Sequence, residues 1–319
     1  MRQAGRYLPE YKQVRVQAKD FLSMCYTPSV ACEVTLQPIR RFGMDGAIIF
    51  SDILVIPDAL GVGVRFEEKI GPVLTPVQSL ADLKKLQWNI EKLSPVYEAL
   101  CLTKAALPEE TTLLGFAGSP WTLACYIVQG QSDQKFGGVK EKAKSDKVFF
   151  GKLIELLSDS VVQHCKKQIE AGADGIQLFD SWAGVLDENE FAQWVIAPNQ
   201  YIVSEFKKSY PHVPVIGFPR CAGKGYLAYA EQTGVDGINI DPSVSLAWAR
   251  DALQEVCLVQ GNLEPVLLAE NKEAMLARAK EIISMLAKKR FIFNLGHGIL
   301  PHTPVEHVQA LCDLIKSYS

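Results

Sequence analysis

The sequence predicts an α/β fold of the (β/α)8, or TIM-barrel, class, and a repeated pattern is the main reason. Three segments share a glycine-rich turn, a short apolar run and an acidic residue after that run, and they span residues 43–52, 172–181 and 234–241. Four more short apolar runs end in polar residues, at 113–119, 213–220, 256–262 and 291–297. Short apolar strands of this kind are typical of a parallel sheet whose two faces are both buried.

Helical patterns separate these runs, which gives the alternation that a barrel needs. Apolar residues recur at i, i+3 and i+4 across 152–170 and again across 267–288. The last helix is expected to open with a capping box, Thr303-Pro304-Val305-Glu306, with proline at the first helical position. No proline- or serine-rich linker divides the chain, so we expect one domain over residues 1–319.

The pattern yields seven strands, one fewer than a closed eight-stranded barrel. A doubly wound open sheet is the alternative. Against it, no Gly-x-Gly-x-x-Gly motif follows any of the strands.

The composition is that of a globular protein with a substantial core, since 48% of the 319 residues are hydrophobic and 22% are charged. No apolar stretch reaches the roughly 18 residues that a membrane span needs, and residues 1–10 are polar, unlike a secretory signal. The cytoplasm is therefore the expected compartment, with no membrane partner. The net charge of −3 gives no reason to expect nucleic acid as a partner.

The cysteines and histidines lack the spacing of a metal site. The eight cysteines are scattered without a Cys-x-x-Cys pair, and the five histidines form no His-x-His, His-x-Cys or His-Glu-x-x-His pattern. No Gly-x-Ser-x-Gly nucleophile elbow and no P-loop occur either. We therefore expect no metal and no disulfide, and we expect the chemistry to rest on arginine, aspartate, tyrosine and histidine.

Polar residues stand where the predicted strands end, and in a barrel such ends supply the catalytic groups. They are Asp52, Ser119, Asp180, Ser181, Arg220, Asp241, Asn262 and His297. His297 lies between two glycines, which leave its ring accessible. Asp52 either caps a helix or belongs to the site. Tyr126 follows the turn at 115–121, where packing and catalysis are both open readings.

Two arginines lie close together near the N-terminus, in Met1-Arg2-Gln3-Ala4-Gly5-Arg6. The small residues between them leave the backbone approachable, and a planar guanidinium pairs bidentately with a carboxylate. A basic region on an acidic protein suits a small polyanionic ligand. The alternative is two solvated arginines at a frayed terminus.

Six segments carry a resemblance to a known family: MRQAGRYLPEY at 1–11, FSDIL at 50–54, GFAGSPWTL at 115–123, QLFDSWAG at 177–184, QGNLEP at 260–265 and NLGHGI at 294–299. Together they resemble uroporphyrinogen decarboxylases over essentially the whole chain, and MRQAGR and GFAGSPWTL are the most specific. The resemblance implies a (β/α)8 barrel, usually a homodimer, that works in haem and tetrapyrrole biosynthesis without metal or organic cofactor. It implies conversion of the four acetate side chains of uroporphyrinogen III to methyl groups, giving coproporphyrinogen III and four carbon dioxide molecules.

The same resemblance implies roles for individual residues. Substrate contacts are implied for Arg2, Gln3, Ala4, Gly5, Arg6, Asp52, Tyr126, Ser181 and His297. Arg2 and Arg6 would face substrate carboxylates, and Asp52 would accept hydrogen bonds from the pyrrole N–H groups, so these three are the implied catalytic residues. Phe116 and Phe179 would form apolar walls beside the macrocycle.

Family members usually carry some two dozen residues, including a strand, ahead of the first motif. We therefore expect the first strand of the barrel to be missing from residues 1–319. Two other functions are considered. Corrinoid-linked methyltransferases share the barrel but bind zinc through histidine and cysteine, and an inactive barrel could bind tetrapyrroles or a partner subunit without catalysis.

Overall fold

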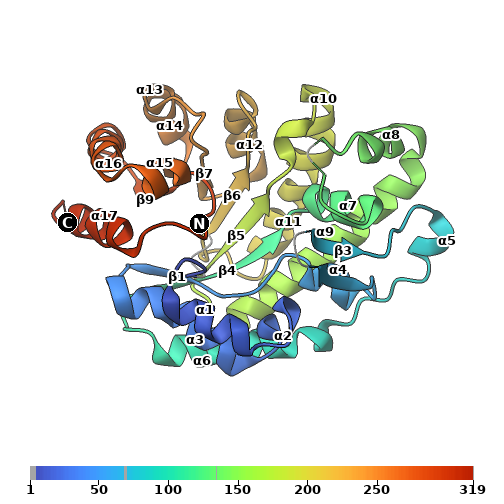
Figure 1. The fold of residues 1–319 in the computed structure, drawn as a ribbon. Coiled ribbons are helices and arrows are strands. Elements are labelled where there is room, and N and C mark those ends of the chain that lie inside the picture. Colours follow the sequence, from blue (N-terminus) through green and yellow to red (C-terminus); the bar gives the residue numbers. More distant parts are fainter. Residues whose placement is uncertain (1–4, 68–69, 134, 319) are drawn as a thin grey trace.

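The computed structural model describes residues 5–67, 70–133 and 135–318, and its centre is one curled parallel sheet (Figure 1). Seven strands pair in the order of the chain: β1 (Gly46–Ile48), β4 (Thr112–Gly118), β5 (Gly175–Asp180), β6 (Val215–Pro219), β7 (Gly237–Asn239), β8 (Leu258–Leu263) and β9 (Phe291–Leu295). The TIM-barrel class and the count of seven central strands are thereby confirmed for the described residues.

Helices surround this sheet in Figure 1. The longer ones are α1 (Pro9–Gln17), α3 (Pro28–Phe42), α6 (Ser94–Ala106), α7 (Pro120–Gln129), α8 (Gly137–Ser145), α9 (Lys147–Glu170), α11 (Ala197–Lys207), α12 (Gly225–Thr233), α16 (Lys272–Leu286) and α17 (Val305–Lys316). The short ones are α2 (Phe21–Cys25), α4 (Val55–Ala59), α5 (Leu80–Leu83), α10 (Glu188–Phe191), α13 (Leu246–Trp248), α14 (Gln254–Val256) and α15 (Pro265–Glu270). An antiparallel pair, β2 (Val64–Glu67) and β3 (Gly71–Leu74), lies outside the main sheet.

Two sequence predictions about helices need correction. The expected continuous helix at 267–288 is two helices, because Asn271 interrupts it and its side chain accepts a hydrogen bond from the backbone N–H of Ala274 at the start of α16. The expected capping box is absent. Pro304 has an extended backbone and is itself the N-cap of α17, so the helix begins only at Val305. The Thr303 hydroxyl is buried and makes no hydrogen bond to any residue that the structure describes.

The repeated Gly-x-Asp-Gly turns have a structural purpose at the N-terminal ends of the strands. Gly43 ends α3 with φ +58° and Gly234 ends α12 with φ +75°, a left-handed conformation that glycine adopts without strain. The aspartates serve the neighbouring strands. Asp174 accepts a 2.7 Å hydrogen bond from the N–H of Leu113, and Asp236 accepts one of 2.7 Å from Val215.

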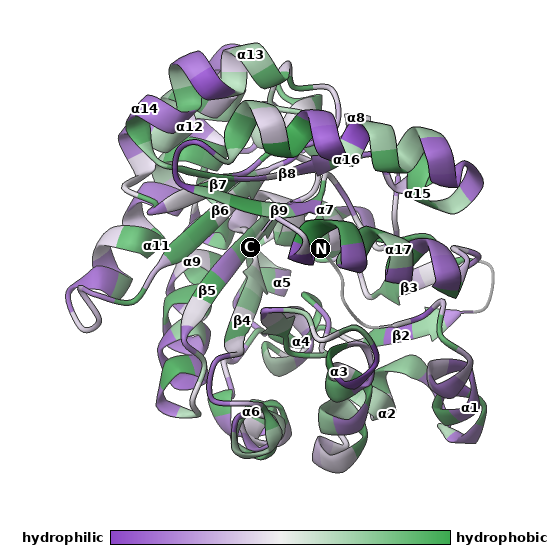
Figure 2. Ribbon diagram, turned by 90° about the vertical axis from the view of Figure 1, so that its left-hand side faces the viewer, coloured by the Kyte–Doolittle hydropathy of each residue, from purple (hydrophilic) through white to green (hydrophobic). Residues whose placement is uncertain are grey.

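The core lies between the sheet and the helices. The central strands are coloured largely as hydrophobic in Figure 2, whereas the outer helices alternate between hydrophobic and hydrophilic residues. α9 buries the side chains of Leu153, Leu157 and Val161 in the predicted spacing. Inside the barrel, by contrast, Gln260 donates hydrogen bonds to Asn239 (2.7 Å) and Gln177 (3.2 Å), which links β8 to β7 and β5.

β1 and β9 are the two edges of the sheet, and no ladder joins them among the described residues. A cavity of about 690 Å³ is lined by residues of both edges, including Ile48 and Phe293, and by the start of several strands. This cavity therefore has the two edges of the sheet in its lining.

Among the described residues, no helix is both long and apolar enough to cross a bilayer.

Candidate active site

Four of the predicted site residues stand at one end of the barrel. All seven central strands are parallel, so their carboxyl ends meet at the same edge of the sheet. Asp52 follows β1, Tyr126 lies on the helix after β4, Ser181 follows β5 directly, and His297 follows β9. We call this end of the barrel, with these four residues, the mouth.

The N-terminal segment is tied to the loop after β9. The Arg6 guanidinium donates two hydrogen bonds to the carbonyl oxygen of Ile299, at 2.9 Å from Nε and 2.6 Å from Nη2. Ile299 is two residues beyond His297, so the structure brings Arg6 to the loop that carries the histidine. Gly5 is buried beside it, whereas Arg2, Gln3 and Ala4 lie outside the described residues.

Asp52 occupies the turn between β1 and α4 and is half-buried. Its Oδ1 accepts a 2.9 Å hydrogen bond from the N–H of Leu54, the residue that itself is the N-cap of α4 and carries no side-chain cap. Asp52 is therefore not the N-cap residue of α4, and the helix-cap interpretation is wrong. The carboxylate orders a turn and also lies near Cys25, whose thiol pKa is raised by burial and further by the charge of Asp52.

Ser181 and Tyr126 are held near each other through Trp182. The Trp182 N–H donates to the Thr122 hydroxyl at 3.2 Å, and its carbonyl oxygen accepts from the Trp121 indole at 3.0 Å. The Trp182 ring lies 6.4 Å from the Tyr126 ring, measured between centroids. The backbone directly after Ser181 is therefore fixed by α7, the same helix that presents Tyr126.

Aromatic rings line the mouth from β4 to β9. Phe116 and Phe179, the two walls named from the sequence, have centroids 5.7 Å apart. Phe218 continues the row at 6.3 Å from Phe179 and 6.4 Å from the ring of His297. Sequence reasoning missed Phe218, since a phenylalanine in an apolar strand carries no signal of a functional position.

Buried polar side chains on the helices hold the strand ends in place. The Gln168 amide on α9 accepts from the Phe116 N–H at 2.9 Å and donates to the Phe116 carbonyl at 3.0 Å. The Thr35 hydroxyl on α3 accepts from the Phe50 N–H at 2.9 Å. Both residues are almost fully buried. In the sequence, such residues are recognisable as polar residues on the otherwise apolar face of a helix.

The loop that carries His297 passes very close to the β7 loop. A Cβ added to Gly296 would lie 2.5 Å from Cδ of Pro242, so only glycine allows this approach. The first glycine beside His297 is therefore required for packing, and the exposed His297 ring is presented by a loop whose course is fixed.

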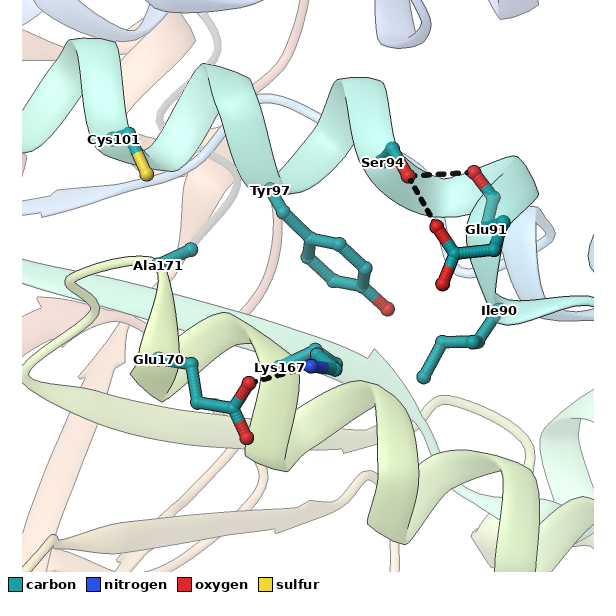
Figure 3. Close-up of a pocket in the computed structure, with 8 residues that line it drawn as sticks. All are labelled: Ile90, Glu91, Ser94, Tyr97, Cys101, Lys167, Glu170 and Ala171. Atoms are coloured by element: carbon teal, nitrogen blue, oxygen red, sulfur yellow. Dashed lines mark hydrogen bonds and ion pairs between the residues drawn. The ribbon is translucent and has the colours of Figure 1, made fainter.

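A second cavity lies away from the mouth (Figure 3). It is a surface groove of about 320 Å³ between α6 and α9, where Lys167 pairs with Glu170 at 2.7 Å and Tyr97 points inward. The Tyr97 hydroxyl is 3.0 Å from Nδ1 of the buried His164. None of the predicted site residues that the structure describes lines this groove.

Within the described ranges, no cluster of three or more histidine, cysteine, aspartate or glutamate side chains is arranged to hold a metal ion.

Comparisons with known proteins all point to one family. A family model described as uroporphyrinogen decarboxylase (URO-D) matches residues 1–318. Proteins named uroporphyrinogen decarboxylase from Rhodospirillum rubrum, Sphingopyxis alaskensis and Rickettsia felis are 48%, 49% and 46% identical to this chain. The alignments cover 99%, 99% and 100% of this chain and 92% of each relative.

Two solved structures share the fold at low identity. A methyltransferase from Methanosarcina mazei has a TM-score of 0.76 at 17% identity, covering 96% of this chain and 90% of that one. A B12-independent methionine synthase from Shewanella sp. W3-18-1 has a TM-score of 0.63 at 10% identity, covering 91% and 88%. At these identities the likeness extends to the barrel and not to the chemistry.

Proposed function

The chain belongs to the uroporphyrinogen decarboxylase family, and we propose that it decarboxylates uroporphyrinogen III at the mouth of the barrel. The observation that carries this proposal is the contact between Arg6 and the His297 loop, beside a row of aromatic rings. A cation bonded to the loop that carries His297, whose ring lies 6.4 Å from that of Phe218, suits a macrocycle with carboxylate side chains. The enzyme is a carboxy-lyase of tetrapyrrole biosynthesis.

The reaction replaces a carboxyl group by a proton at each of the four acetate side chains. The carbon–carbon bond to the carboxylate breaks, carbon dioxide leaves, and the methylene carbon takes up a proton to become a methyl group. Loss of carbon dioxide would leave carbanion-like charge, so the substrate needs an electron sink. Protonation of the adjacent pyrrole carbon makes the ring itself that sink, and no organic cofactor is needed. The pyrrole carbon loses this proton again once the methylene carbon has been protonated, so one proton is consumed for each carbon dioxide released.

Asp52 has the central electrostatic role in this proposal. As an ionised carboxylate aimed at the pyrrole N–H groups, it stabilises the cationic ring formed on protonation. Its bond to Leu54 supports the proposal, because a carboxylate anchored at one oxygen does not have to reorganise during the reaction. One such preorganised contact is typically worth about 3 kcal/mol.

The remaining residues bind and orient the substrate. Arg2 and Arg6, with Gln3, Ala4 and Gly5 between them, bind substrate carboxylates, and Tyr126, Ser181 and His297 make further polar contacts. Phe116 and Phe179 pack against the macrocycle. The proton comes from water or from a carboxylic acid bound by arginine.

We further propose that residues 1–319 act as one domain in a cytoplasmic homodimer, without a metal or organic cofactor. The eight cysteines, all free thiols in the structure, are in keeping with a reducing compartment.

The test is turnover of uroporphyrinogen III under reducing, anaerobic conditions, with the products separated by chromatography. The proposal expects stepwise loss of carboxyl groups and accumulation of coproporphyrinogen III. Zinc bound in stoichiometric amount by the purified protein, together with no decarboxylation, would favour methyl-transfer chemistry instead.

A further inference from the structure

We propose that Arg220 is a further substrate-binding residue, which pairs with a carboxylate side chain of the porphyrinogen at the mouth. This inference rests on the proposed function and adds a cation on the β6 side of the mouth.

The strand register directs Arg220 toward the barrel interior. Gln177 on β5 is bonded to Gln260 on β8, and these strands are not neighbours, so the Gln177 side chain lies inside the barrel. Gln177 pairs with Ile216 on β6, and paired residues share a face. Side chains alternate along a strand, which places Phe218 and then Arg220 on the same inner face.

Two observations support this direction. Phe218, two residues earlier, has its ring 6.4 Å from that of His297, across the mouth. The β5–β6 ladder also continues to Arg220, whose N–H donates to the carbonyl oxygen of Asp180 at 3.0 Å. Arg220 directly follows the last residue of β6, and its N–H also contacts the Phe218 carbonyl oxygen at 3.0 Å, so the strand ends at the residue before it.

The backbone on both sides of Arg220 is fixed. Its carbonyl oxygen accepts from the Gly184 N–H at 3.0 Å. The next residue, Cys221, adopts a left-handed conformation with φ +60°, and its N–H donates to Asp241 Oδ2 at 2.8 Å. A Cβ on Gly184 would lie 2.5 Å from the Cys221 Cβ, so the two loops meet closely. A strained residue held this firmly keeps the backbone of Arg220 in one position, which lowers the entropic cost of binding.

The charge of Arg220 is not neutralised by the protein. Among the residues that the structure describes, its half-buried guanidinium has no hydrogen bond and no ion pair. The adjacent carboxylate of Asp241 is already engaged by the Tyr226 hydroxyl at 2.6 Å and by the N–H and hydroxyl of Ser243. The Asp180 carboxyl group is fully buried and bonded to Thr122. A partly desolvated arginine at a ligand-binding mouth is suited to a carboxylate of the ligand.

The test compares steady-state kinetics of the wild-type protein with Arg220→Ala, Arg220→Lys and a control, Lys224→Ala. Lys224 is an exposed cation four residues away that no contact ties to the mouth. We expect Arg220→Ala to raise KM about tenfold or more, by loss of a charged hydrogen bond, with a smaller change in kcat. Arg220→Lys should recover part of the affinity, because it keeps the charge and loses the bidentate fork. Lys224→Ala should behave as the wild type.

The outcomes separate this inference from the proposed function. If the wild type turns over the substrate and the folded Arg220→Ala protein has an unchanged KM, the role of Arg220 is overturned and the proposed function stands. No turnover by the wild type would overturn the proposed function and the inference with it. If the melting temperature shows that Arg220→Ala does not fold, the KM of Arg220→Lys and Arg220→Gln decides, and wild-type values in both would overturn the inference.

Discussion

Thr122 donates its hydroxyl proton to Asp180 in a fully buried contact between α7 and β5, with 2.6 Å between Oγ1 and Oδ1. The other carboxyl oxygen, Oδ2, is buried without a hydrogen bond among the described residues. Burial raises the pKa of Asp180 to about 7, and the Thr122 hydrogen bond opposes only part of this effect. Asp180 therefore keeps its proton in the folded protein under conditions in which the unfolded chain releases it.

Asp180→Asn should change how stability depends on pH. Between the unfolded pKa of 3.8 and the folded value of about 7, the folded state binds the extra proton, so this group lowers stability as pH rises. The loss is about 1.4 kcal/mol per pH unit, or roughly 4 kcal/mol in total. Chemical denaturation from pH 4 to 8 should show the variant gaining stability relative to wild type across this range. A pH-independent difference would mean that Asp180 is ionised in the fold.

His164 should act in the opposite direction. It is fully buried beside Tyr97, and burial lowers its pKa from 6.5 to about 3. The unfolded chain takes up this proton below pH 6.5 while the folded protein does not, so stability falls with decreasing pH by about 1.4 kcal/mol per unit. His164→Gln should remove this loss, so the stability of the variant relative to the wild type should rise as the pH falls from 6.5 to about 3.

The matched control is His212→Gln, because His212 is exposed. Because the windows of His164 and Asp180 overlap between pH 3.8 and 6.5, their effects largely offset each other in the wild type. Each single variant should therefore depend on pH more steeply than the parent protein in this range. The stability should rise with pH in Asp180→Asn and fall with pH in His164→Gln.

Thiol reactivity should divide the eight cysteines by exposure. Cys101 and Cys221 are exposed, Cys32 is half-buried, and the other five are buried. Burial raises the pKa of Cys257 and of Cys312 to about 11, which leaves little thiolate to react near neutral pH. A thiol-specific reagent should modify at most about three groups in the folded protein and all eight after unfolding. Fewer than eight in the unfolded protein would indicate a disulfide or a bound metal, and Cys101→Ser should remove the fastest phase.

The sequence predicted the sheet well because strands and turns are encoded locally. The glycine-rich turns, the short apolar runs and the polar strand ends all lie within about ten residues of one another, and the structure places them as expected. The contacts that shape the mouth are not local. Gln168 holds Phe116 from 52 positions away, and Thr122 holds Trp182 from 60. No single-sequence pattern pairs such residues.

Two wrong predictions concern the exact residue at which a helix begins. Thr303 and Glu306 have the spacing of a capping box, but the extended backbone of Pro304 moves the start of the helix to Val305. Asp52 is the second example. Its position before a helix suggested a cap, yet the carboxylate bonds to Leu54 ahead of the first turn. A one- or two-residue shift of a helix boundary changes the role of a side chain, and such shifts are below the resolution of sequence patterns.

Arg6→Ala should weaken substrate binding. The arginine is proposed to contact a substrate carboxylate in both the ground state and the transition state, so its loss should raise KM about tenfold to a hundredfold with a smaller effect on kcat. Its removal also frees the Ile299 carbonyl, so the melting temperature has to be measured alongside. Lys12→Ala, on the exposed face of α1, is the matched control. A drop in kcat at constant KM would contradict a ground-state role.

Asp52→Asn should lower kcat and kcat/KM together, by roughly 10²–10³-fold, with a smaller change in substrate binding. Asparagine keeps the side-chain shape and the oxygen that accepts from Leu54, so the turn and the melting temperature should be preserved. What it removes is the negative charge proposed to stabilise the protonated pyrrole, and that interaction exists fully only in the transition state. Asp251→Asn, at an exposed position on the surface, should leave both constants unchanged. If Asp52 served only to order its turn, asparagine would replace it with little loss, and a near-normal kcat in a folded Asp52→Asn protein would leave the charge-stabilisation mechanism without support.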